Sequence, residues 1–387
     1  VDLRKHIESV SIVEPDFKHS PIELHADKDL KKRIKKHQNF ENYLSCQLLL
    51  SEAMIDKEVF DAYELTKQDK EMVLEKEGEC IGGLPVCKEA LASYLNEREP
   101  QKLFSLNHIR DYIQELPLKE FKDEEKQIIE SDFQTLYQTH NDLEKICIRH
   151  QVNPINIWYW FKKSSVIPEQ RMNDLAFEYL ILLVREILEE DDDGIIPLVP
   201  NAGEKILIDR LQEKFLNKGF SNAQFSDYEF ILGRSINDYI NENFFLKLSD
   251  CLKLFKQLPA TPFIWHLSSG PERGFECYII IYKWNRDNLL RLRSVYIENR
   301  ERALQNRQSD IAGNDSAEAQ NEKERIFKQL IEIESFKKKI DELLAEGYNP
   351  ILDDGVGKNI APLQNKKMLP YDVLNAGQLK KYLNADW

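Results

Sequence analysis

The 387-residue sequence lacks the short motifs that mark common cofactor-binding and catalytic sites. It has no Gly-x-x-x-x-Gly-Lys-Ser/Thr loop, no Gly-x-Gly-x-x-Gly turn and no Gly-x-Ser-x-Gly elbow. These absences argue against a phosphate-binding loop, a dinucleotide or S-adenosylmethionine cradle, and a hydrolase nucleophile. The Asn/Asp-Pro-Pro-aromatic motif of amino-methyltransferases is also missing, because Asn153-Pro154-Ile155 and Asn349-Pro350-Ile351 lack the second proline. We therefore expect no catalytic residue, no complete active site and no cofactor within these residues.

Cysteine and glycine are scarce, with 6 and 14 residues. The cysteines form no Cys-x-x-Cys pair and the 8 histidines have no zinc spacing, so we expect reduced thiols, no metal site and a cytoplasmic protein. No secretory signal is visible. The longest apolar run, Phe177–Leu188, is interrupted by charges and is too short to span a bilayer, so we expect no membrane partner. Since the chain begins at Val1 and not at Met, we expect it to be a fragment.

The charge balance is acidic. The net charge is −14 and 31% of the residues are charged, against about 25% in typical domains. This excludes a free-standing, strongly basic DNA-binding protein but permits a basic face on an acidic body. The high charge and the few glycines predict long solvated helices, in two or three domains of roughly 150 residues.

One β-hairpin is predicted near residues 261–282. Two short runs rich in aromatic and β-branched residues, Pro262–Leu267 and Phe275–Tyr282, flank the turn-rich segment Ser268–Gly274. The rest of the sequence shows helical periodicity. Phe40–Ala62 reads as a helix with Ile55 and Val59 among its apolar positions, and Tyr63–Glu77 as a second amphipathic helix. We predict a mainly α fold with bundle-like helical domains, one small antiparallel β element and a long helical hairpin over about residues 286–345.

The first helix of that hairpin holds the most basic patch of the sequence. Asn285 is a suitable N-cap, and arginines follow at seven-residue spacing: Arg286, Arg293, Arg300 and Arg307. Seven residues are close to two helical turns, so the four guanidinium groups should form one stripe. We predict that this stripe and the neighbouring Arg291 bind the phosphates of duplex DNA.

The second helix of the hairpin is predicted over Asn321–Ala345, after a connector rich in small polar residues. Its apolar positions recur every three or four residues: Phe327, Leu330, Ile333, Phe336, Ile340 and Leu343. We expect this stripe to face the apolar side of the arginine helix: Leu289, Leu292, Tyr296 and Leu304. Acids such as Glu332, Glu334 and Asp341 provide the alternative for the arginines, which is internal ion pairing in place of DNA contact.

A helix-turn-helix pattern covers Asp142–Lys163, with the turn at Gln151–Pro154. The second helix of the pattern carries the residues that we predict to contact DNA: Asn156, Trp160, Lys162 and Lys163. Asparagine can read adenine and tryptophan can stack on an unpaired base, whereas lysine binds phosphate. The alternative is an αα-hairpin in which Trp158 and Trp160 are core or interface anchors. A basic run at Lys28–Lys36 is interpreted as a solvated helix face in preference to a nucleic-acid contact.

Three pieces of the C-terminal third resemble a known family: Phe263–Gly270, Tyr282–Asp287, and Leu352–Val356 with Asn359-Ile360. They are similar to the C-terminal part of the large BREX phage-defence adenine-specific DNA methyltransferases (PglX type) and of related single-chain restriction–modification enzymes. The resemblance covers residues 259–387, with a looser match from residue 142.

The resemblance implies that the methyl-transfer core, with its S-adenosylmethionine site, belongs to an upstream domain. This chain would then position duplex DNA and contact the upstream domain and other defence-system subunits. The alternative is a helical interaction scaffold that has no DNA contact. We expect three regions, at residues 1–140, 141–258 and 259–387.

Overall fold

A computed structural model describes residues 2–12, 14, 17–97, 107–253 and 258–384. The chain divides into two compact units, Val1–Tyr179 and Leu180–Trp387, and the division falls inside helix α10. Each unit has its own hydrophobic core. The three sequence regions proposed above stay a prediction, because compactness alone does not define domains.

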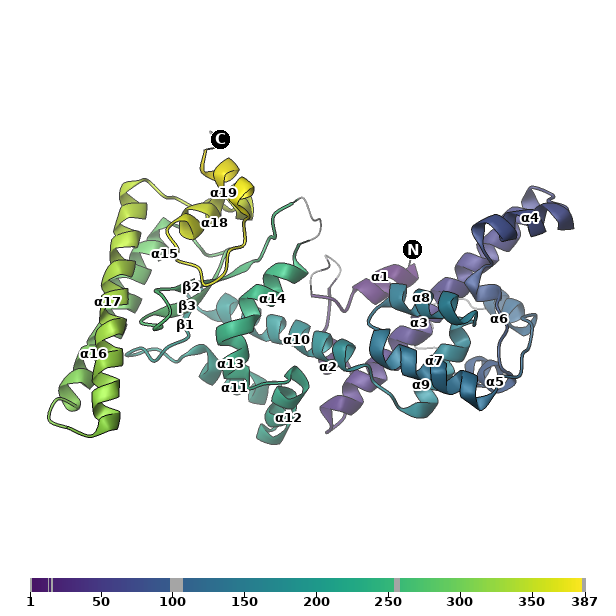
Figure 1. Cartoon of the computed structure of the whole chain (residues 1–387), viewed down its shortest axis with the longest axis horizontal. Helices are drawn as coiled ribbons and strands as arrows, with labels where there is room; N and C mark the ends of the chain where they lie inside the picture. The colour runs from purple at the N-terminus through teal and green to yellow at the C-terminus, as the bar shows by residue number, and fades with distance from the viewer. Residues whose placement is uncertain (1, 13, 15–16, 98–106, 254–257, 385–387) are drawn as a thin grey trace. The chain divides into compact units, whose positions relative to one another are not determined.

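Unit 1 is entirely helical in its described part (Figure 1). Its elements, with α10 continuing into unit 2, are α1 (Asp2–Glu8), α2 (Pro21–Leu24), α3 (Leu30–Ala62), α4 (Lys67–Glu77), η1 (Ile81–Gly83), α5 (Lys88–Asn96), α6 (Asn107–Gln114), α7 (Asp123–Leu136), α8 (His140–His150), α9 (Pro154–Ser164) and α10 (Glu169–Glu190).

The long helix α3 and the helix pair α8–α9 build the core of unit 1. Asp29 caps α3, since its Oδ1 accepts a hydrogen bond from the N–H of Lys31 at 2.9 Å. Gln151 lies in the left-handed region with a φ of 51°, which turns the chain sharply between α8 and α9. The two helices bury Trp158 and Trp160, which are 1% and 2% exposed. Both tryptophans are therefore core residues, as in the αα-hairpin alternative.

Unit 2 combines helices with one small sheet. Its elements are β1 (Ile195–Pro197), α11 (Leu207–Asn217), α12 (Asn222–Leu232), α13 (Ile236–Asp238), η2 (Tyr239–Asn243), α14 (Phe244–Cys251), β2 (Ile264–Ser268), β3 (Glu276–Ile280), α15 (Arg286–Arg291), η3 (Leu292–Ile297), α16 (Glu298–Asp310), α17 (Ala317–Ala345), η4 (Leu352–Asp354), α18 (Gly355–Asn365) and α19 (Ala376–Leu383).

The sheet has three antiparallel strands in the order β1-β3-β2. The predicted hairpin is present, with Ser268 opposite Glu276 at its turn end. The sequence did not predict the third strand, β1, which pairs Ile195 with Ile279 from a distant part of the chain. All the strand residues are buried, so the sheet lies inside unit 2 and supports the helices around it.

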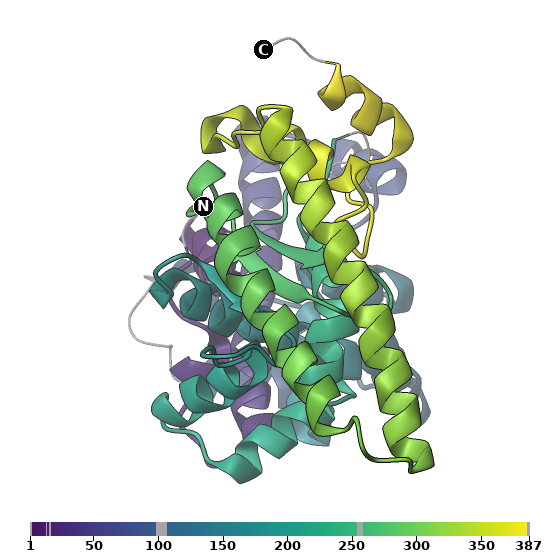
Figure 2. The same ribbon diagram turned by 90° about the vertical axis from the view of Figure 1, so that its left-hand side faces the viewer.

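The predicted helical hairpin is formed by α15, η3 and α16 on one side and α17 on the other (Figure 2). Asn285 caps its first helix, because its side-chain oxygen accepts from the N–H of Asn288 at 3.0 Å. The facing apolar positions are buried in one core, except Phe327, which is 59% exposed, and Leu330, which is partly buried. The mainly α fold with one small antiparallel element is therefore confirmed.

The first helix of the hairpin contains a π-helical segment, η3. A π turn closes its hydrogen bonds one residue later than an α turn, so residues after it are rotated relative to residues before it. Arg286, before η3, and Arg300, after it, therefore do not keep the angular relation that seven-residue spacing gives in an α-helix, whereas Arg300 and Arg307 both lie on α16. No helix in the described part of the chain is both long enough and apolar enough to cross a membrane.

Candidate functional site

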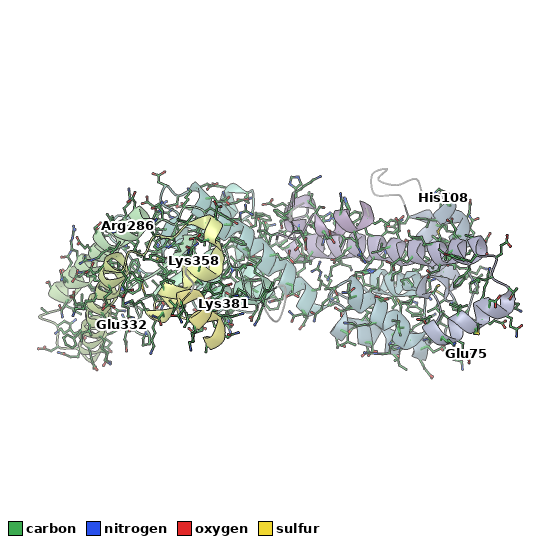
Figure 3. The ribbon with its side chains drawn as sticks, turned by 90° about the horizontal axis from the view of Figure 1, so that it is seen from above. Glu75, His108, Arg286, Glu332, Lys358 and Lys381 are labelled. Carbon is green, nitrogen blue, oxygen red and sulfur yellow. The ribbon has the colours of Figure 1, made fainter. Side chains whose placement is uncertain are left out.

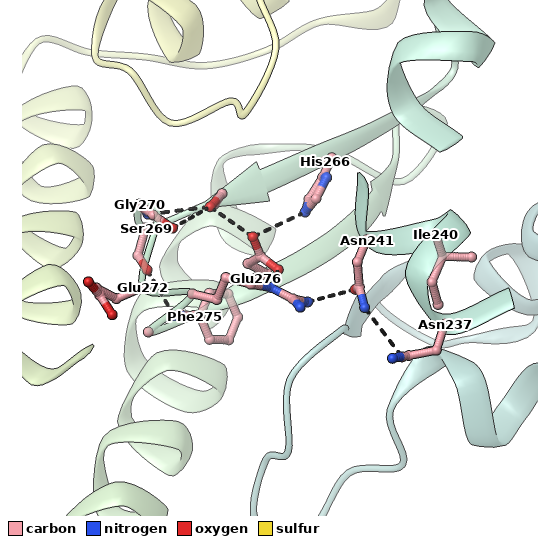
Figure 4. Close-up of polar contacts among 12 residues, drawn as sticks. Asn237, Ile240, Asn241, His266, Ser269, Gly270, Glu272, Phe275 and Glu276 are labelled. Atoms are coloured by element: carbon pink, nitrogen blue, oxygen red, sulfur yellow. Dashed lines mark hydrogen bonds and ion pairs between the residues drawn. The ribbon is translucent and has the colours of Figure 1, made fainter. Parts of the chain in front are cut away.

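The turn of the β-hairpin holds a network of polar contacts in unit 2 (Figure 4). At the strand ends, the Ser268 hydroxyl donates to Glu276 Oε1 at 3.1 Å. Arg273 Nε donates to the other carboxylate oxygen of Glu276 at 2.5 Å, and its Nη2 reaches Asn241 at 2.7 Å. His266 Nε2 lies 3.7 Å from Glu276 and has no hydrogen-bond partner among the described residues.

Burial controls the protonation of this network. It raises the pKa of Glu276, and the Arg273 guanidinium opposes that increase. It lowers the pKa of His266 to about 3, and the positive charge of Arg273 adds to the decrease. His266 is therefore neutral at pH 7.

The combination of Ser268, His266 and Glu276 does not form a nucleophilic triad. The serine hydroxyl contacts the carboxylate and not the imidazole, whereas a triad needs the base beside the nucleophile. The three side chains are also buried, at 6%, 2% and 4% exposure, so a substrate has no access to them. The network is a structural support for the hairpin.

Glu332 of α17 enters the same turn from the helical side. Its carboxylate accepts hydrogen bonds from the N–H groups of Glu272 at 2.8 Å and Gly274 at 3.1 Å, and from the Ser269 hydroxyl at 3.2 Å. The backbone N–H groups of this turn therefore form a small anion-binding concavity, which the protein fills with its own carboxylate.

Arg300 of α16 holds the other side of that turn. Its Nε donates to the carbonyl of Gly274 at 2.9 Å and its Nη1 donates to the carbonyl of Pro200 at 2.8 Å. Its side chain is 8% exposed and has no carboxylate partner in the described ranges. Burial lowers the pKa of Arg300 to about 10, and the charges of Arg325 and Arg273 add to this decrease. Arg300 thus acts as a buried donor to the backbone.

The other arginines of the predicted stripe lie in three different environments. Arg293 pairs with Asp341 through two contacts at 3.0 and 3.3 Å, and Arg307 pairs with Glu322 at 2.8 and 2.9 Å. Arg291 is 58% exposed at its side chain and contacts Asp193 at 2.8 Å. Arg286 is exposed and has no ion pair within the described residues (Figure 3).

The structure therefore does not bring the five arginines together on one open face. Of the three acids expected to pair with the arginines, only Asp341 is seen to do so among the described residues, with Arg293. Glu332 binds backbone N–H groups of the turn, and Glu322, which was not considered, binds Arg307. DNA contact by these arginines stays a prediction, and Arg286 and Arg291 are the two whose charge is most open to solvent.

In unit 1 the four predicted DNA contacts also separate. Asn156 is fully buried: its Oδ1 accepts from the N–H of Cys87 and its Nδ2 donates to the carbonyl of Pro85, both at 2.8 Å. Trp160 packs edge-on against Phe121. In this conformation neither side chain has surface available to a base.

Lys162 and Lys163 lie at the end of α9. Lys162 bonds to Glu97 at 2.5 Å and sits 4.9 Å from the centre of the Trp158 ring. Lys163 is exposed and has no hydrogen bond or ion pair in the described part of the chain. Of the four residues, only Lys163 presents an unpaired charge to solvent.

The sequence contained a signal for the residues that were missed. Glu276 and His266 are polar residues inside otherwise apolar strands, and a polar residue in such a position is normally buried with a partner. Glu276 binds Arg273 of the turn, and Arg273 in turn binds Asn241 of a distant helix. Local patterns do not show such pairings. No group of three or more His, Cys, Asp or Glu residues in the described ranges has a geometry suited to a metal ion.

These features define a mainly helical protein whose small sheet anchors a helical hairpin. No family model matches the chain. The chain is 24% identical over 194 residues to the adenine-specific methyltransferase BrxX of Escherichia coli O9:H4 (strain HS), and the match covers 44% of this chain and 16% of that relative. The similarity supports a distant relationship to BREX-type adenine-specific methyltransferases, and the match spans only 16% of the length of that relative.

Proposed function

We propose that this chain is a non-catalytic, DNA-recognition and assembly portion of an adenine-specific DNA methyltransferase from a phage-defence or restriction–modification system. The similarity to BrxX carries the proposal, because it links the chain to an adenine-specific methyltransferase while covering 16% of that relative's length. On this proposal, an upstream domain binds S-adenosylmethionine, flips the adenine and methylates it. This chain positions the duplex and holds other parts of the enzyme.

Arg286 and Arg291 are the strongest candidates for a phosphate contact in unit 2. Both are exposed and lie on α15, five residues apart along the helix. Arg286 has no competing carboxylate among the described residues, whereas Arg291 contacts Asp193, whose side chain is only 13% exposed. A phosphate at Arg286 therefore displaces no ion pair, and a phosphate at Arg291 would bind the exposed guanidinium beside Asp193.

A helical scaffold without DNA contact is the second candidate function. The observation that favours it is the internal pairing of Arg293 and Arg307 and the burial of Arg300. These three arginines hold the helical hairpin and the turn together, so they account for most of the basic stripe without any external anion.

Duplex DNA titrations separate the two candidates. We expect the chain to bind labelled duplex weakly and with a steep salt dependence, and Arg286→Ala with Arg291→Ala to weaken that binding. For each phosphate that the variant no longer binds, the slope of log K against log salt should become shallower by about 0.9. Lys380→Ala with Lys381→Ala is the matched control, since it removes the same charge from the exposed face of α19. The scaffold would be favoured if the arginine and the lysine double variants weakened DNA binding equally, or if the wild-type chain did not bind DNA.

A further inference from the structure

The end of α3 and the whole of α4 form a helical arm, which we define as residues 51–79 (Figure 1). No residue of α4 is buried. The helix is nevertheless well defined by a capping box, in which Thr66 Oγ1 accepts from the N–H of Asp69 and the Asp69 carboxylate accepts from the N–H of Thr66. An 11-residue helix is only marginally stable without packing. The arm thus consists of ordered helix that adds little to the core of unit 1.

The α3 side of the arm presents an apolar stripe to solvent. Ile55, Val59 and Tyr63 follow one another at four-residue spacing and are 59%, 45% and 77% exposed. This spacing places them on one face of the helix. Met72 of α4 adds a further apolar side chain that is 52% exposed. The sequence pattern placed Ile55 and Val59 among the apolar positions of the helix, and the structure leaves them uncovered within the described residues. Clustered apolar exposure of this kind marks an interaction surface.

The arm is also strongly acidic. It contains ten Asp or Glu residues and four lysines, which gives a net charge of −6. A cavity of about 350 Å³ lies at its base, between aliphatic side chains that include Leu49 and Ile148. Five carboxylates line the cavity: Glu52, Asp56, Glu77, Glu79 and Glu144. No lysine or arginine is among its described lining residues.

The carboxylates at the base of the arm are close enough to affect one another. Burial raises the pKa of Glu52, and Glu144 and Asp56 add to this increase while Arg4 opposes it. A cationic group placed in the cavity would relieve this repulsion. The aliphatic walls suit the methylene groups of a lysine or arginine side chain, whose charged end would face the carboxylates.

We infer that the arm is a docking surface for a basic, amphipathic segment of a partner protein. Apolar residues of the partner would cover Ile55, Val59 and Tyr63, and a lysine or arginine would enter the acidic cavity. Charge complementarity decides the class of partner. DNA phosphates would be repelled by the arm, and a second copy of the chain would bring two surfaces of the same sign together. The inference does not depend on DNA binding by unit 2.

The test uses a labelled synthetic peptide that forms an amphipathic helix, with leucines on one face and lysines on the other. We expect Val59→Ser with Tyr63→Ser, and separately Glu52→Gln with Glu144→Gln, to weaken binding of this peptide to the full chain about tenfold, equivalent to ~1.4 kcal/mol. The same peptide with glutamates in place of lysines should not bind.

Matched controls come from unit 2. Phe327→Ser with Ile331→Ser removes two apolar side chains of similar exposure, 59% and 55%, and Asp310→Asn with Glu318→Gln removes two exposed carboxylates. These pairs should change binding by about twofold at most. Circular dichroism establishes that each variant is folded. Equal weakening by arm and control variants would mean non-specific attraction to an acidic protein, and absence of peptide binding would also overturn the inference.

Discussion

Arg300 and Glu332 bind the two backbone groups of the same residue, Gly274. Arg300 Nε donates to its carbonyl at 2.9 Å, and the Glu332 carboxylate accepts from its N–H at 3.1 Å. Since Arg300 lies on α16 and Glu332 on α17, both helices of the hairpin are fixed to one point of the β-turn. This relationship explains why a basic residue of the stripe is buried in a protein with so much acidic surface.

Removal of Arg300 should destabilise unit 2. Arg300→Ala leaves the carbonyls of Gly274 and Pro200 without this donor, and we expect a loss of about 1–3 kcal/mol in the free energy of unfolding. Arg302→Ala, at a side chain that is 66% exposed, should change it by no more than about 0.5 kcal/mol. Urea unfolding followed by tryptophan fluorescence measures both. Equal midpoints for the two variants would contradict the structural role of Arg300.

The close approach at Gly274 gives a second prediction. A Cβ atom there would lie 2.5 Å from the backbone oxygen of Gln329 and 3.2 Å from Ile333 Cγ1. Because a helix backbone cannot move aside easily, Gly274→Ala should cost about 1–3 kcal/mol of stability. Gly313→Ala is the control, since a Cβ at Gly313 meets nothing within 4 Å. Thermal unfolding should show a lower midpoint for Gly274→Ala alone, and an unchanged midpoint would mean that α17 is not held against the turn.

The buried histidine of the sheet predicts acid sensitivity. The pKa of His266 is about 3 in the folded protein, below its ordinary value of 6.5, so the unfolded chain binds the proton first. Stability should therefore fall as the pH decreases from about 6.5 towards 3, by up to ~1.4 kcal/mol per pH unit from this residue. Glu276, 3.7 Å from His266, has the opposite effect on the pH dependence of stability. Because burial raises its pKa, its contribution to stability is present at low pH and is lost as the pH rises through the raised pKa.

His266→Gln removes this contribution and should flatten the dependence of the urea midpoint on pH between 6.5 and 4.5. The other groups that face His266 are Arg273 and the rings of Tyr278 and Phe245, and they are unchanged in this variant. His108→Gln, at an exposed histidine, serves as the control (Figure 3). If the slope of His266→Gln equals that of the wild type, another group is responsible for the acid response.

A buried ion pair in unit 1 gives the fourth prediction. Arg171 contacts Glu41 through two nitrogens, with Nε at 3.1 Å from Oε2, and both side chains are nearly inaccessible. Burial favours the neutral form of Arg171, but Glu41 and Glu178 raise its pKa above the ordinary value. Arg171→Met leaves two carboxylates without this partner and should cost about 3–5 kcal/mol.

Adding Glu41→Met to Arg171→Met should recover part of that loss, because the second change removes the carboxylate that was in direct contact with Arg171. A double-mutant cycle on the free energy of unfolding measures the coupling. Simple additivity of the two single effects would show that the pair is not coupled in the folded protein.

Local patterns predicted the elements of the fold well. Two runs rich in aromatic and β-branched residues around a turn-rich segment located the β-hairpin, and helical periodicity located the two helices of the hairpin at residues 286–345. The N-cap at Asn285 was visible because an asparagine side chain bonds to the backbone only three residues ahead. Such features depend on neighbours in sequence, so they could be predicted without tertiary information.

The candidate site depended on distant contacts. The seven-residue spacing of the arginines suggested one open stripe, but the turn at Gly274 and the Pro200 segment cover Arg300, and Asp341 and Glu322 of α17 pair with Arg293 and Arg307. Asn156 also depends on distant contacts, because its side-chain amide bonds to the backbone of Pro85 and Cys87, which lie outside the α8–α9 helix pair. Exposure and pairing depend on what packs against a side chain, and spacing along one helix cannot provide that.

The sequence by itself determined the helices of the hairpin and the strands β2 and β3, since backbone hydrogen bonding and the burial of one apolar face are local requirements, whereas β1 needed a partner from a distant part of the chain. The tertiary structure alone decided the use of each charge: Arg300 and Glu332 hold a turn, Arg171 and Glu41 pair inside unit 1, and the acids of the arm remain open to solvent. The reason is physical. A charged side chain is stable wherever it finds a donor, an acceptor or water, and only the folded arrangement determines which of these it meets.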